Sequence, residues 1–450
     1  MSKPLMISVS GIRGIVGEGL SPDIVIKYAA AAGTFYGPGR VLVGRDSRVT
    51  GGMIRHAVFS GLMGVGCDPV DLGVCATPTV ELAVRRSDAV GGIIITASHN
   101  PVEWNALKLL GPDGMFLGSE EGETVKTVAE TGKLAWKPWD RIGRSGRDAS
   151  ATNAHVDHIL GLSILDRKRI AERCFRVAFD SVNGAGGLIV PKILEALGCE
   201  VFPLNEEPTG LFAHTPEPVP QNLTDLSERV RAAHANVGFA VDPDADRLAV
   251  VNEKGEPIGE EYTLALAVRH ILSKIKGPVV VNASTSRAVD DIAAEYGVDV
   301  TKTKVGEIHV SKKMQEIGAV IGGEGNGGVI LPSSLLGRDA MAAMVLILQA
   351  MAETDRPVSE IWQSLPQYRM SKKKIEIGNR DPDRIIERIA KKYEKEKINQ
   401  MDGLKIEWSA SWVQIRKSNT EPIIRVMAEA RSAEKAEALC GRFIREIEKA

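Results

Sequence analysis

Ser98 has the residue type and the setting of a catalytic group, and it lies in the polar segment TASHNP at 96–101. The apolar run before it, Ile93–Ile95, is too short and too β-branched for a helix and predicts a buried strand. Pro101 restricts the residue before it to extended or turn geometry, so Ser98 and His99 are expected in a fixed loop. Open α/β sheets bind ligands at the carboxyl ends of their strands. Ser98 is therefore a candidate nucleophile, and an ordinary strand-end turn of small polar residues is the alternative.

Three carboxylates alternate in the segment DPDADR, at Asp242, Asp244 and Asp246. A turning loop with that period can direct all three at one point, and hard oxygen ligands suit Mg²⁺. Arg247 follows directly and could offer its planar fork to a phosphate. A cation and an arginine together indicate phosphoryl transfer, in which Ser98 would carry the phosphoryl group. The alternative is an Asp-rich turn that binds no metal.

Two further side chains near Ser98 could move protons. Lys108 lies ten residues after Ser98 and could act as proton donor or acceptor if Arg13 or a metal crowds it, because an ammonium shifts its pKa readily. A surface lysine is the alternative. His99 could orient a phosphoserine or simply cap its own loop.

Two later segments could bind a phosphorylated sugar. The glycine-rich GGEGNGG at 322–328 allows close backbone approach to a ligand, and Glu324 can accept hydrogen bonds from two neighbouring sugar hydroxyls. RKSNTEP at 416–422 groups a cation with hydroxyl and amide donors after a strand, which suits a phosphate monoester. A polar turn is the alternative there, and each segment is weak evidence by itself.

The elements that must position these segments recur three times along the chain. In each copy a β-branched strand precedes a helix that stops at a glycine, where a left-handed cap is wanted. A second strand follows at once, and a third strand then opens into a polar loop. The alternative is the recurrence of βαβ patterns in any large α/β protein. The copies span 40–100, 174–247 and 277–328, and their helices end at Gly66, Gly198 and Gly297.

The length of 450 residues exceeds what one hydrophobic core supports, so several domains are expected. The repeats and the composition changes predict three related α/β domains with mixed sheets and a smaller C-terminal α+β domain. The predicted domains are 1–150, 151–255, 256–366 and 367–450. Lysine-rich stretches at 372–374 and 391–397 are interpreted as solvated helix faces, with a site for an anionic partner as the alternative.

Composition excludes several classes of protein. With 44% hydrophobic residues, 25% charged residues and a formal charge of -2, the chain is expected to be soluble, globular and without affinity for nucleic acid. Its five cysteines form no Cys-x-x-Cys pair, which argues against disulfides or a zinc site and favours a reducing cytoplasm. The most apolar stretch, Met341–Met351, is too short to cross a bilayer, so neither secretion nor membrane insertion is expected.

The four segments TASHNP, DPDADR, GGEGNGG and RKSNTEP, in this order and spacing, resemble the α-D-phosphohexomutases over essentially the whole chain. The resemblance implies four domains around a central cleft and an isomerase that works as an intramolecular phosphotransferase. It implies that Ser98 is phosphorylated and passes its phosphoryl group to a hexose 6- or 1-phosphate. The bisphosphate, which also serves as activator, then turns over in the cleft and returns its other phosphate to Ser98.

The same resemblance assigns roles to individual residues. Mg²⁺ would be held by the seryl phosphate of Ser98 and three aspartates, namely Asp242, Asp244 and Asp246. The loop SVSGIRG at 8–14 would bring Arg13 to the seryl phosphate, Lys108 would be the acid/base lysine, and Glu324 would read sugar hydroxyls. Catalysis would also involve His99 and Arg247, and substrate binding would involve Asn326, Arg416, Ser418, Asn419, Thr420 and Arg425.

The glycine-rich segment at 322–328, which we call the sugar loop, departs from the commoner family pattern Glu-x-Ser-Gly-His. Asn326 replaces the serine and Gly328 the histidine. Val305-Gly306-Glu307 looks more like the phosphoglucosamine mutase branch than like the phosphomannomutase/phosphoglucomutases, which are the alternative. Two other classes remain: an aspartyl-phosphate phosphatase using Asp242 or Asp244, and a non-catalytic sugar-phosphate binding protein. A monomer or a homodimer is expected.

Overall fold

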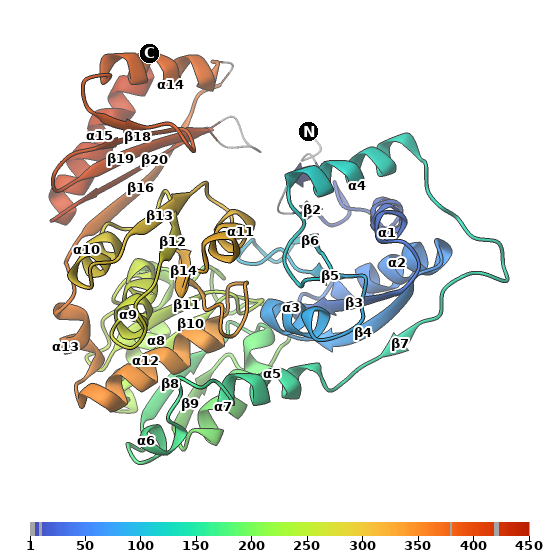
Figure 1. Ribbon diagram of the computed structural model, residues 1–450, viewed down its shortest axis with the longest axis horizontal. Coiled ribbons are helices and arrows are strands. Elements are labelled where there is room, and N and C mark those ends of the chain that lie inside the picture. The colour runs from blue at the N-terminus through green and yellow to red at the C-terminus, as the bar shows by residue number, and fades with distance from the viewer. Residues whose placement is uncertain (1–4, 9–10, 379, 418–422, 450) are drawn as a thin grey trace.

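The computed structural model describes residues 5–8, 11–378, 380–417 and 423–449, which form four β-sheets with flanking helices (Figure 1). The three α/β sheets and the C-terminal sheet follow one another along the chain, and each lies inside one of the four segments predicted above. The boundaries near 150, 255 and 366 themselves stay predictions.

The first sheet is built around strand β3 (Arg40–Arg45), which pairs in parallel with β4 (Asp68–Val74) and β5 (Gly91–Ile95). Strand β6 (Trp104–Leu110) then adds to β5 in the antiparallel direction. Three outer strands complete a seven-stranded sheet: β1 (Met6–Ser8), β2 (Gly11–Ile15) and β7 (Gly146–Arg147). The strand predicted at 93–95 is therefore confirmed.

The second and third sheets repeat the order of β6, β5, β3 and β4. Their first strand is central, the second and third flank it in parallel, and a fourth is antiparallel, so the predicted repeats and mixed sheets are confirmed. The strands of the second sheet are β8 (Arg176–Asp180), β9 (Glu200–Leu204), β10 (Val237–Val241) and β11 (Leu248–Asn252). Those of the third are β12 (Val279–Asn282), β13 (Val300–Thr303), β14 (Ile321–Glu324) and β15 (Gly328–Ile330).

The three glycines predicted to stop the helices do so with left-handed backbone angles. Gly66, Gly198 and Gly297 have φ of 86°, 72° and 66°, and each lies two residues beyond the helix before it. A left-handed residue ends a helix at little cost when it has no Cβ. The helices concerned are α2 (Gly51–Gly64), α7 (Val190–Ala196) and α10 (Ala288–Glu295).

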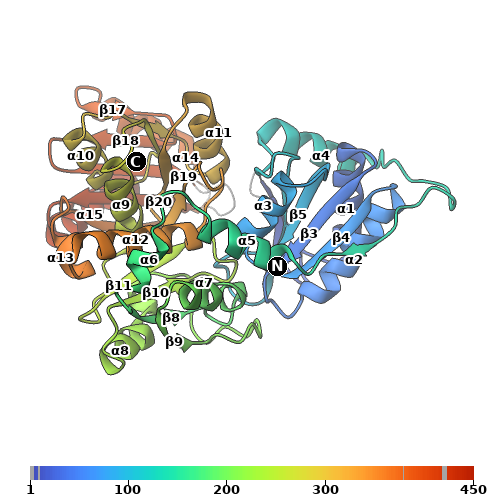
Figure 2. The same ribbon diagram turned by 60° about the horizontal axis from the view of Figure 1, so that its bottom comes forward.

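Helices cover both faces of the first sheet, which explains why β5 is apolar throughout. Ile93 and Ile95 pack in a cluster with α1 (Pro22–Tyr36) and α2, whereas Ile94 packs with α3 (Thr77–Arg85) on the other face (Figure 2). The remaining α-helices of the three α/β units are α4 (Ser119–Thr131), α5 (Ala151–Leu160), α6 (Arg167–Ala171), α8 (Thr224–Ala232), α9 (Glu260–Leu272), α11 (Glu307–Ile317), α12 (Ala340–Thr354) and α13 (Val358–Gln363).

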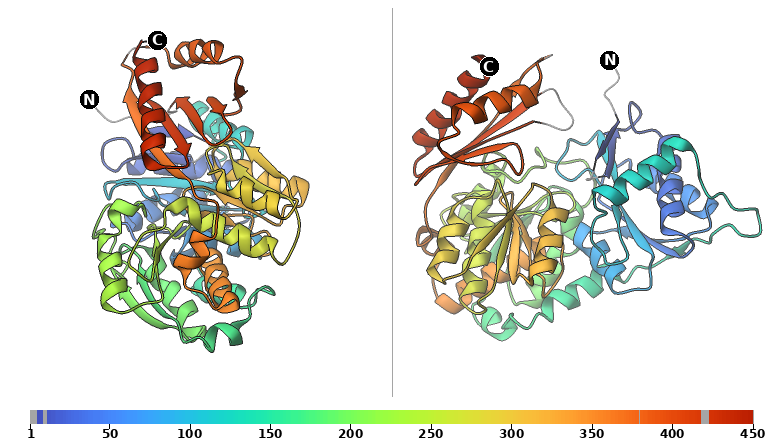
Figure 3. Two further views of the ribbon diagram at one scale, coloured as in Figure 1. Left: turned by 90° about the vertical axis from the view of Figure 1, so that its left-hand side faces the viewer. Right: turned by 45° about the horizontal axis from the view of Figure 1, so that its top comes forward.

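The C-terminal unit is an antiparallel sheet with helices α14 (Pro382–Lys392) and α15 (Ala433–Lys449), as the α+β prediction requires (Figure 3). The prediction that the lysines at 372–374 lie on a helix was wrong, because they belong to a strand that pairs with β20 over its whole length. The second lysine-rich stretch, 391–397, runs from the end of α14 into β17. The strands are β16 (Arg369–Glu376), β17 (Lys397–Asn399), β18 (Leu404–Glu407), β19 (Trp412–Lys417) and β20 (Ile423–Ala430).

Two further features concern the cysteines and the apolar helices. All five cysteines lie in the described part of the chain and are free. Among the described helices, none has both the length and the apolar character needed to span a bilayer. The apolar stretch Met341–Met351 belongs to α12, which packs in the core between the second and third sheets.

Candidate active site

A cleft of about 580 Å³ lies where the four units meet. Its walls carry predicted site residues from all four units, so the structure brings together segments that are hundreds of residues apart in the sequence. These residues are Arg13, Ser98, His99, Lys108, Arg247, Glu324, Asn326, Arg416 and Arg425.

Ser98 occupies a strained position at the carboxyl end of β5. Its φ of 49° is left-handed, which is uncommon for a residue with a side chain and is typical of functional loops. Its backbone N–H donates to Thr96 Oγ1 at 2.9 Å, and its Oγ donates to Asp242 Oδ2 at 2.7 Å. The loop conformation thus directs the hydroxyl from the first sheet onto the aspartate turn of the second.

Arg48, to which the sequence pattern assigned no role, holds the Ser98 loop in this conformation. Asp46 accepts from Arg48 Nε at 3.0 Å and from Thr96 Oγ1 at 2.6 Å, so the buried guanidinium is paired. An arginine and an aspartate directly after a buried strand were the available signal, since buried charges require partners. The guanidinium also donates, at 2.6 to 3.0 Å, to the carbonyl oxygens of Ser98, Asn100, Pro101 and Trp104.

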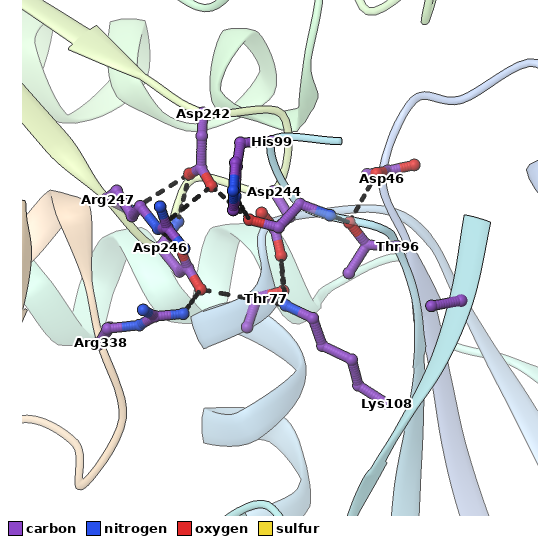
Figure 4. A network of polar contacts seen from close by, with 12 residues as sticks. Asp46, Thr77, Thr96, His99, Lys108, Asp242, Asp244, Asp246, Arg247 and Arg338 are labelled. Atoms are coloured by element: carbon purple, nitrogen blue, oxygen red, sulfur yellow. Dashed lines mark hydrogen bonds and ion pairs between the residues drawn. The ribbon is translucent and has the colours of Figure 1, made fainter. Parts of the chain in front are cut away.

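The three aspartates at the end of β10 are fully buried, and each accepts hydrogen bonds from the surrounding protein. Asp242 Oδ1 accepts from the backbone N–H groups of Asp246 and Arg247 at 3.1 and 3.2 Å. Asp244 Oδ2 accepts from Lys108 Nζ at 2.9 Å and from a threonine hydroxyl of α3 at 2.7 Å. Asp246 Oδ2 accepts from an arginine of the third unit at 2.5 Å (Figure 4).

The remaining oxygens of the cluster suit a metal ion. Within the described part of the chain, Oδ1 of Asp244 and Oδ1 of Asp246 are buried without a hydrogen-bond partner. One oxygen from each of the three aspartates lies within 4.8 Å of the others. Burial, and then the charges of Asp246 and Asp244, raises the pKa of Asp242 well above its usual value. A divalent cation would relieve that repulsion and use the free oxygens, so the residues present fit one.

Lys108 is buried beneath the cleft and is not the surface lysine of the alternative interpretation. Burial by itself lowers the pKa of its ammonium, but the carboxylates of Asp244 and Asp246 outweigh burial, and the net shift is upward. The ring of Phe116 lies 5.6 Å from Nζ and provides a further favourable contact for the cation. Lys108 is therefore held in its charged form.

His99 has the opposite character. Burial, followed by the positive charges of Arg247 and Arg13, lowers the pKa of its imidazole well below the usual value. Its Nδ1 lies 3.3 Å from Ser98 Oγ, so a neutral ring faces the hydroxyl. Arg13 donates to the Asn100 side chain at 2.8 Å, which brings this guanidinium to the Ser98 loop.

The sugar-loop carboxylate is fixed from two sides. Glu324 Oε1 accepts from Asn282 Nδ2 at 2.8 Å and from the backbone N–H of Gly306 at 2.9 Å. Its Oε2 accepts from Arg338 at 2.8 Å. Asn326 accepts an N–H bond from Gly328 at 3.2 Å, which closes the turn between β14 and β15.

Two charged residues near this loop, Arg338 and Glu81, were not found by sequence reasoning. Glu307 was noted only as part of a family segment and was given no role. Glu307 is buried beside Arg338, and burial raises its pKa to about 7. Glu81 lies on α3, and among the described residues neither of its carboxylate oxygens has a hydrogen-bond partner. Burial and the neighbouring Glu307 and Asp246 raise the pKa of Glu81 well above its usual value.

The C-terminal unit contributes two arginines to the cleft. Arg416 on β19 pairs across the sheet with Arg425 on β20, and both line the cavity. Three other residues of the predicted phosphate-binding segment at 416–422 lie outside the described residues, namely Ser418, Asn419 and Thr420.

Models of the phosphoglucomutase/phosphomannomutase family match nearly the whole chain. Its alpha/beta/alpha domains I, II and III match residues 5–135, 153–255 and 259–368, and its C-terminal domain matches 373–446.

Individual proteins agree with this result. The chain is 39% identical to a "Probable phosphoglucosamine mutase" of Methanopyrus kandleri, over 97% of this chain and 96% of the relative. It is also 39% identical to a phosphoglucomutase/phosphomannomutase of Thermococcus kodakarensis, over 95% and 94%. A crystal structure of a phosphoglucomutase/phosphomannomutase family protein from Burkholderia thailandensis superposes with a TM-score of 0.85 at 26% identity, covering 99% of this chain and 98% of the other. The chain therefore belongs to the phosphoglucomutase/phosphomannomutase family, the α-D-phosphohexomutases indicated by its four motifs, and is an isomerase of that class.

Proposed function

We propose that this phosphohexomutase interconverts glucosamine 6-phosphate and glucosamine 1-phosphate through a phosphoserine at Ser98. The observation that carries the proposal is the contact of Ser98 Oγ with Asp242 at 2.7 Å, at the floor of a cleft lined with arginines. The names of several relatives and the segment Val305-Gly306-Glu307 support glucosamine as the sugar. Glucose and mannose phosphates are the alternatives.

The aspartate cluster would hold Mg²⁺, with Asp242, Asp244 and Asp246 as its protein ligands. When bound, the ion supplies positive charge to the oxygens of the phosphoryl group in transfer. The chain adds its own cations around the same point, since Arg247 lies 3.7 Å from Asp246 and Lys108 2.9 Å from Asp244. These cations are already in place before the reaction, so they would stabilise the negative charge that develops on the phosphoryl oxygens.

Proton transfer is assigned to Lys108, and the orientation of the serine oxygen to His99. Lys108 is held as an ammonium and is the donor for the oxygen that leaves the phosphoryl group. His99 is neutral beside Ser98 Oγ and orients that oxygen through Nδ1. When the phosphoryl group returns to the serine, the same groups act in the reverse sense, as microscopic reversibility requires.

The reaction needs the sugar to present either phosphate to Ser98. Arg416 and Arg425 lie side by side across two strands and would hold the phosphate that is not reacting. Glu324 would accept from the sugar hydroxyls between the two phosphate positions. No phosphate is consumed, because the bisphosphate returns one group to Ser98 in each cycle.

The geometry disfavours an aspartyl-phosphate phosphatase. Asp242, Asp244 and Asp246 are fully buried, whereas Ser98 faces the cleft. Hydroxylamine separates the two classes, because it cleaves an acyl phosphate and leaves a seryl ester intact. A binding protein would carry no covalent phosphate.

Substrate preference gives the most direct test of the sugar assignment. We expect kcat/KM for glucosamine 6-phosphate to exceed the values for glucose and mannose 6-phosphates, measured on one purified sample with Mg²⁺. A higher value for glucose or mannose phosphate would overturn the assignment to glucosamine and leave the mutase mechanism in place.

The phosphate anchor should be shared by both isomers. Removing a charge-assisted donor worth about 1.5 to 3 kcal/mol by Arg416→Ala should lower kcat/KM for the 1-phosphate and the 6-phosphate alike, by roughly ten- to a hundredfold. Arg442→Ala is the matched control, because this arginine contacts Tyr393 and Glu446 on α15 and does not line the cleft. A large loss for one isomer with none for the other would rule out a common anchor.

A further inference from the structure

Arg338 is held rigidly at the edge of the third sheet. Its backbone forms a bridge with Ile330 of β15, and the next N–H, of Asp339, donates to Val329 O at 2.9 Å. Asp339 also caps α12 by accepting from the N–H of Met341 at 2.9 Å. The side chain of Arg338 therefore starts from a fixed point on the cleft wall.

The guanidinium of Arg338 meets three carboxylates from two different units. It donates to Asp246 Oδ2 at 2.5 Å (Figure 4). It also donates to Glu324 Oε2 at 2.8 Å, and its Nε lies 3.0 Å from Glu307 Oε2. Only 9% of its side chain is exposed. The two terminal nitrogens of this buried guanidinium donate to carboxylates of different units, and Nε only lies close to a third carboxylate, so the side chain links the aspartate turn of the second unit to the sugar loop of the third.

The same side chain explains the glycine at position 328. A Cβ on Gly328 would lie 2.3 Å from Cδ and 3.0 Å from Cγ of Arg338. Gly328 does not have the left-handed φ that would itself demand glycine. Position 328 of the sugar loop must therefore be glycine because the side chain of Arg338 passes directly over it. The arginine fills the space that a larger residue would take.

We propose that Arg338 is the positioning residue of the sugar site. It occupies the volume beside Gly328 and holds Glu324 in the orientation that accepts substrate hydroxyls. By binding Oδ2 of Asp246 it also leaves Oδ1 of that residue directed at the other two aspartates. The inference rests on the proposed function, since Glu324 has a substrate to read only if a sugar phosphate enters the cleft.

The test measures binding by calorimetry in the Ser98→Ala parent with Mg²⁺ present, so that no turnover occurs. We expect Arg338→Ala to weaken glucosamine 6-phosphate by roughly tenfold or more, because a misoriented Glu324 loses its hydroxyl contacts. Binding of inorganic phosphate, which needs only the anchor, should change by less than about twofold. Equal binding of the sugar phosphate by parent and variant would overturn the inference alone. A parent that binds no hexose phosphate would overturn the proposed function as well.

Inorganic phosphate also distinguishes other roles for Arg338. A loss of phosphate binding equal to that of the sugar phosphate would make Arg338 a phosphate ligand or a merely structural residue, and would overturn the inference. Arg442→Ala in the same parent controls for loss of a surface arginine and should bind both ligands as the parent does.

Gly328→Ala gives an independent measurement that does not require Arg338→Ala to fold. The added methyl group must displace the stem of Arg338 at Cδ and Cγ, and with it the guanidinium, so Gly328→Ala should also weaken glucosamine 6-phosphate selectively. In the double variant the close contacts with Arg338 are gone and Asn326 Oδ1, at 3.1 Å, is the nearest contact that remains for the methyl group, so its additional effect should be below about twofold. An equal effect of Gly328→Ala with and without Arg338 would overturn the inference.

Discussion

Ser98→Ala is expected to lower mutase turnover by a factor on the order of 10³ or more, because it removes the oxygen that carries the phosphoryl group. The fold should survive. The lost hydrogen bond from Oγ to Asp242 costs about 1 to 3 kcal/mol, which is small beside the cores of four units. The measurements are kcat with glucosamine 6-phosphate and the melting temperature of the same sample.

A second serine controls for the loss of a hydroxyl. Ser60 lies exposed on α2 and its hydroxyl donates to the His56 carbonyl of the same helix, so Ser60→Ala should keep full turnover. Mass spectrometry of active protein should place a phosphate on Ser98 that survives hydroxylamine. Turnover within a few-fold of the parent in Ser98→Ala would remove the phosphoserine from the mechanism.

The local features of the site could be predicted from sequence because their causes are local. A β-branched apolar run such as Ile93–Ile95 reports a strand buried on two faces, and a polar segment after it reports the ligand-binding edge. Gly66, Gly198 and Gly297 were recognisable as helix ends because a left-handed cap favours the residue without a Cβ.

The lysines at 372–374 were assigned to a helix by mistake because the cause of their structure is not local. Charge predicts exposure to solvent but does not distinguish a helix face from a strand. All three are exposed on β16, where Lys372 reaches Glu260 and Glu261 of the third unit at 2.9 and 3.1 Å. The pairing of these lysines with residues 425–427 of β20, more than fifty positions away, determined the structure, and a short polar stretch does not encode that partner.

Arg48 and Arg338 escaped sequence reasoning because their partners come from distant parts of the chain. Arg338 contacts residues 14, 31 and 92 positions away, and Arg48 contacts the Ser98 loop 50 positions away. No motif spacing connects such groups. What the sequence offers is a charged residue next to a buried element, which indicates that a partner exists without identifying it.

Removal of the metal should have an effect as large as removal of the serine. We expect a chelator to abolish turnover and added Mg²⁺ to restore it, because the charge on the transferring phosphoryl group is otherwise left to the side-chain cations. Zn²⁺ should support little turnover, since it prefers tetrahedral nitrogen and sulfur ligands to an oxygen octahedron. Full activity in excess chelator would contradict the assignment of the aspartate cluster.

Asp244→Asn tests the cluster by a measurement other than activity. Mg²⁺ at a hundred times its Kd should stabilise the wild-type fold by about 2.7 kcal/mol, seen as a higher melting temperature. The asparagine offers one neutral oxygen in place of a carboxylate, so the same Mg²⁺ concentration should stabilise this variant much less. Asp88→Asn, on an exposed pair with Arg40, should respond as wild type does. An equal Mg²⁺-dependent shift in all three proteins would mean that the ion binds elsewhere, and the free oxygens of Asp244 and Asp246 would then need another partner.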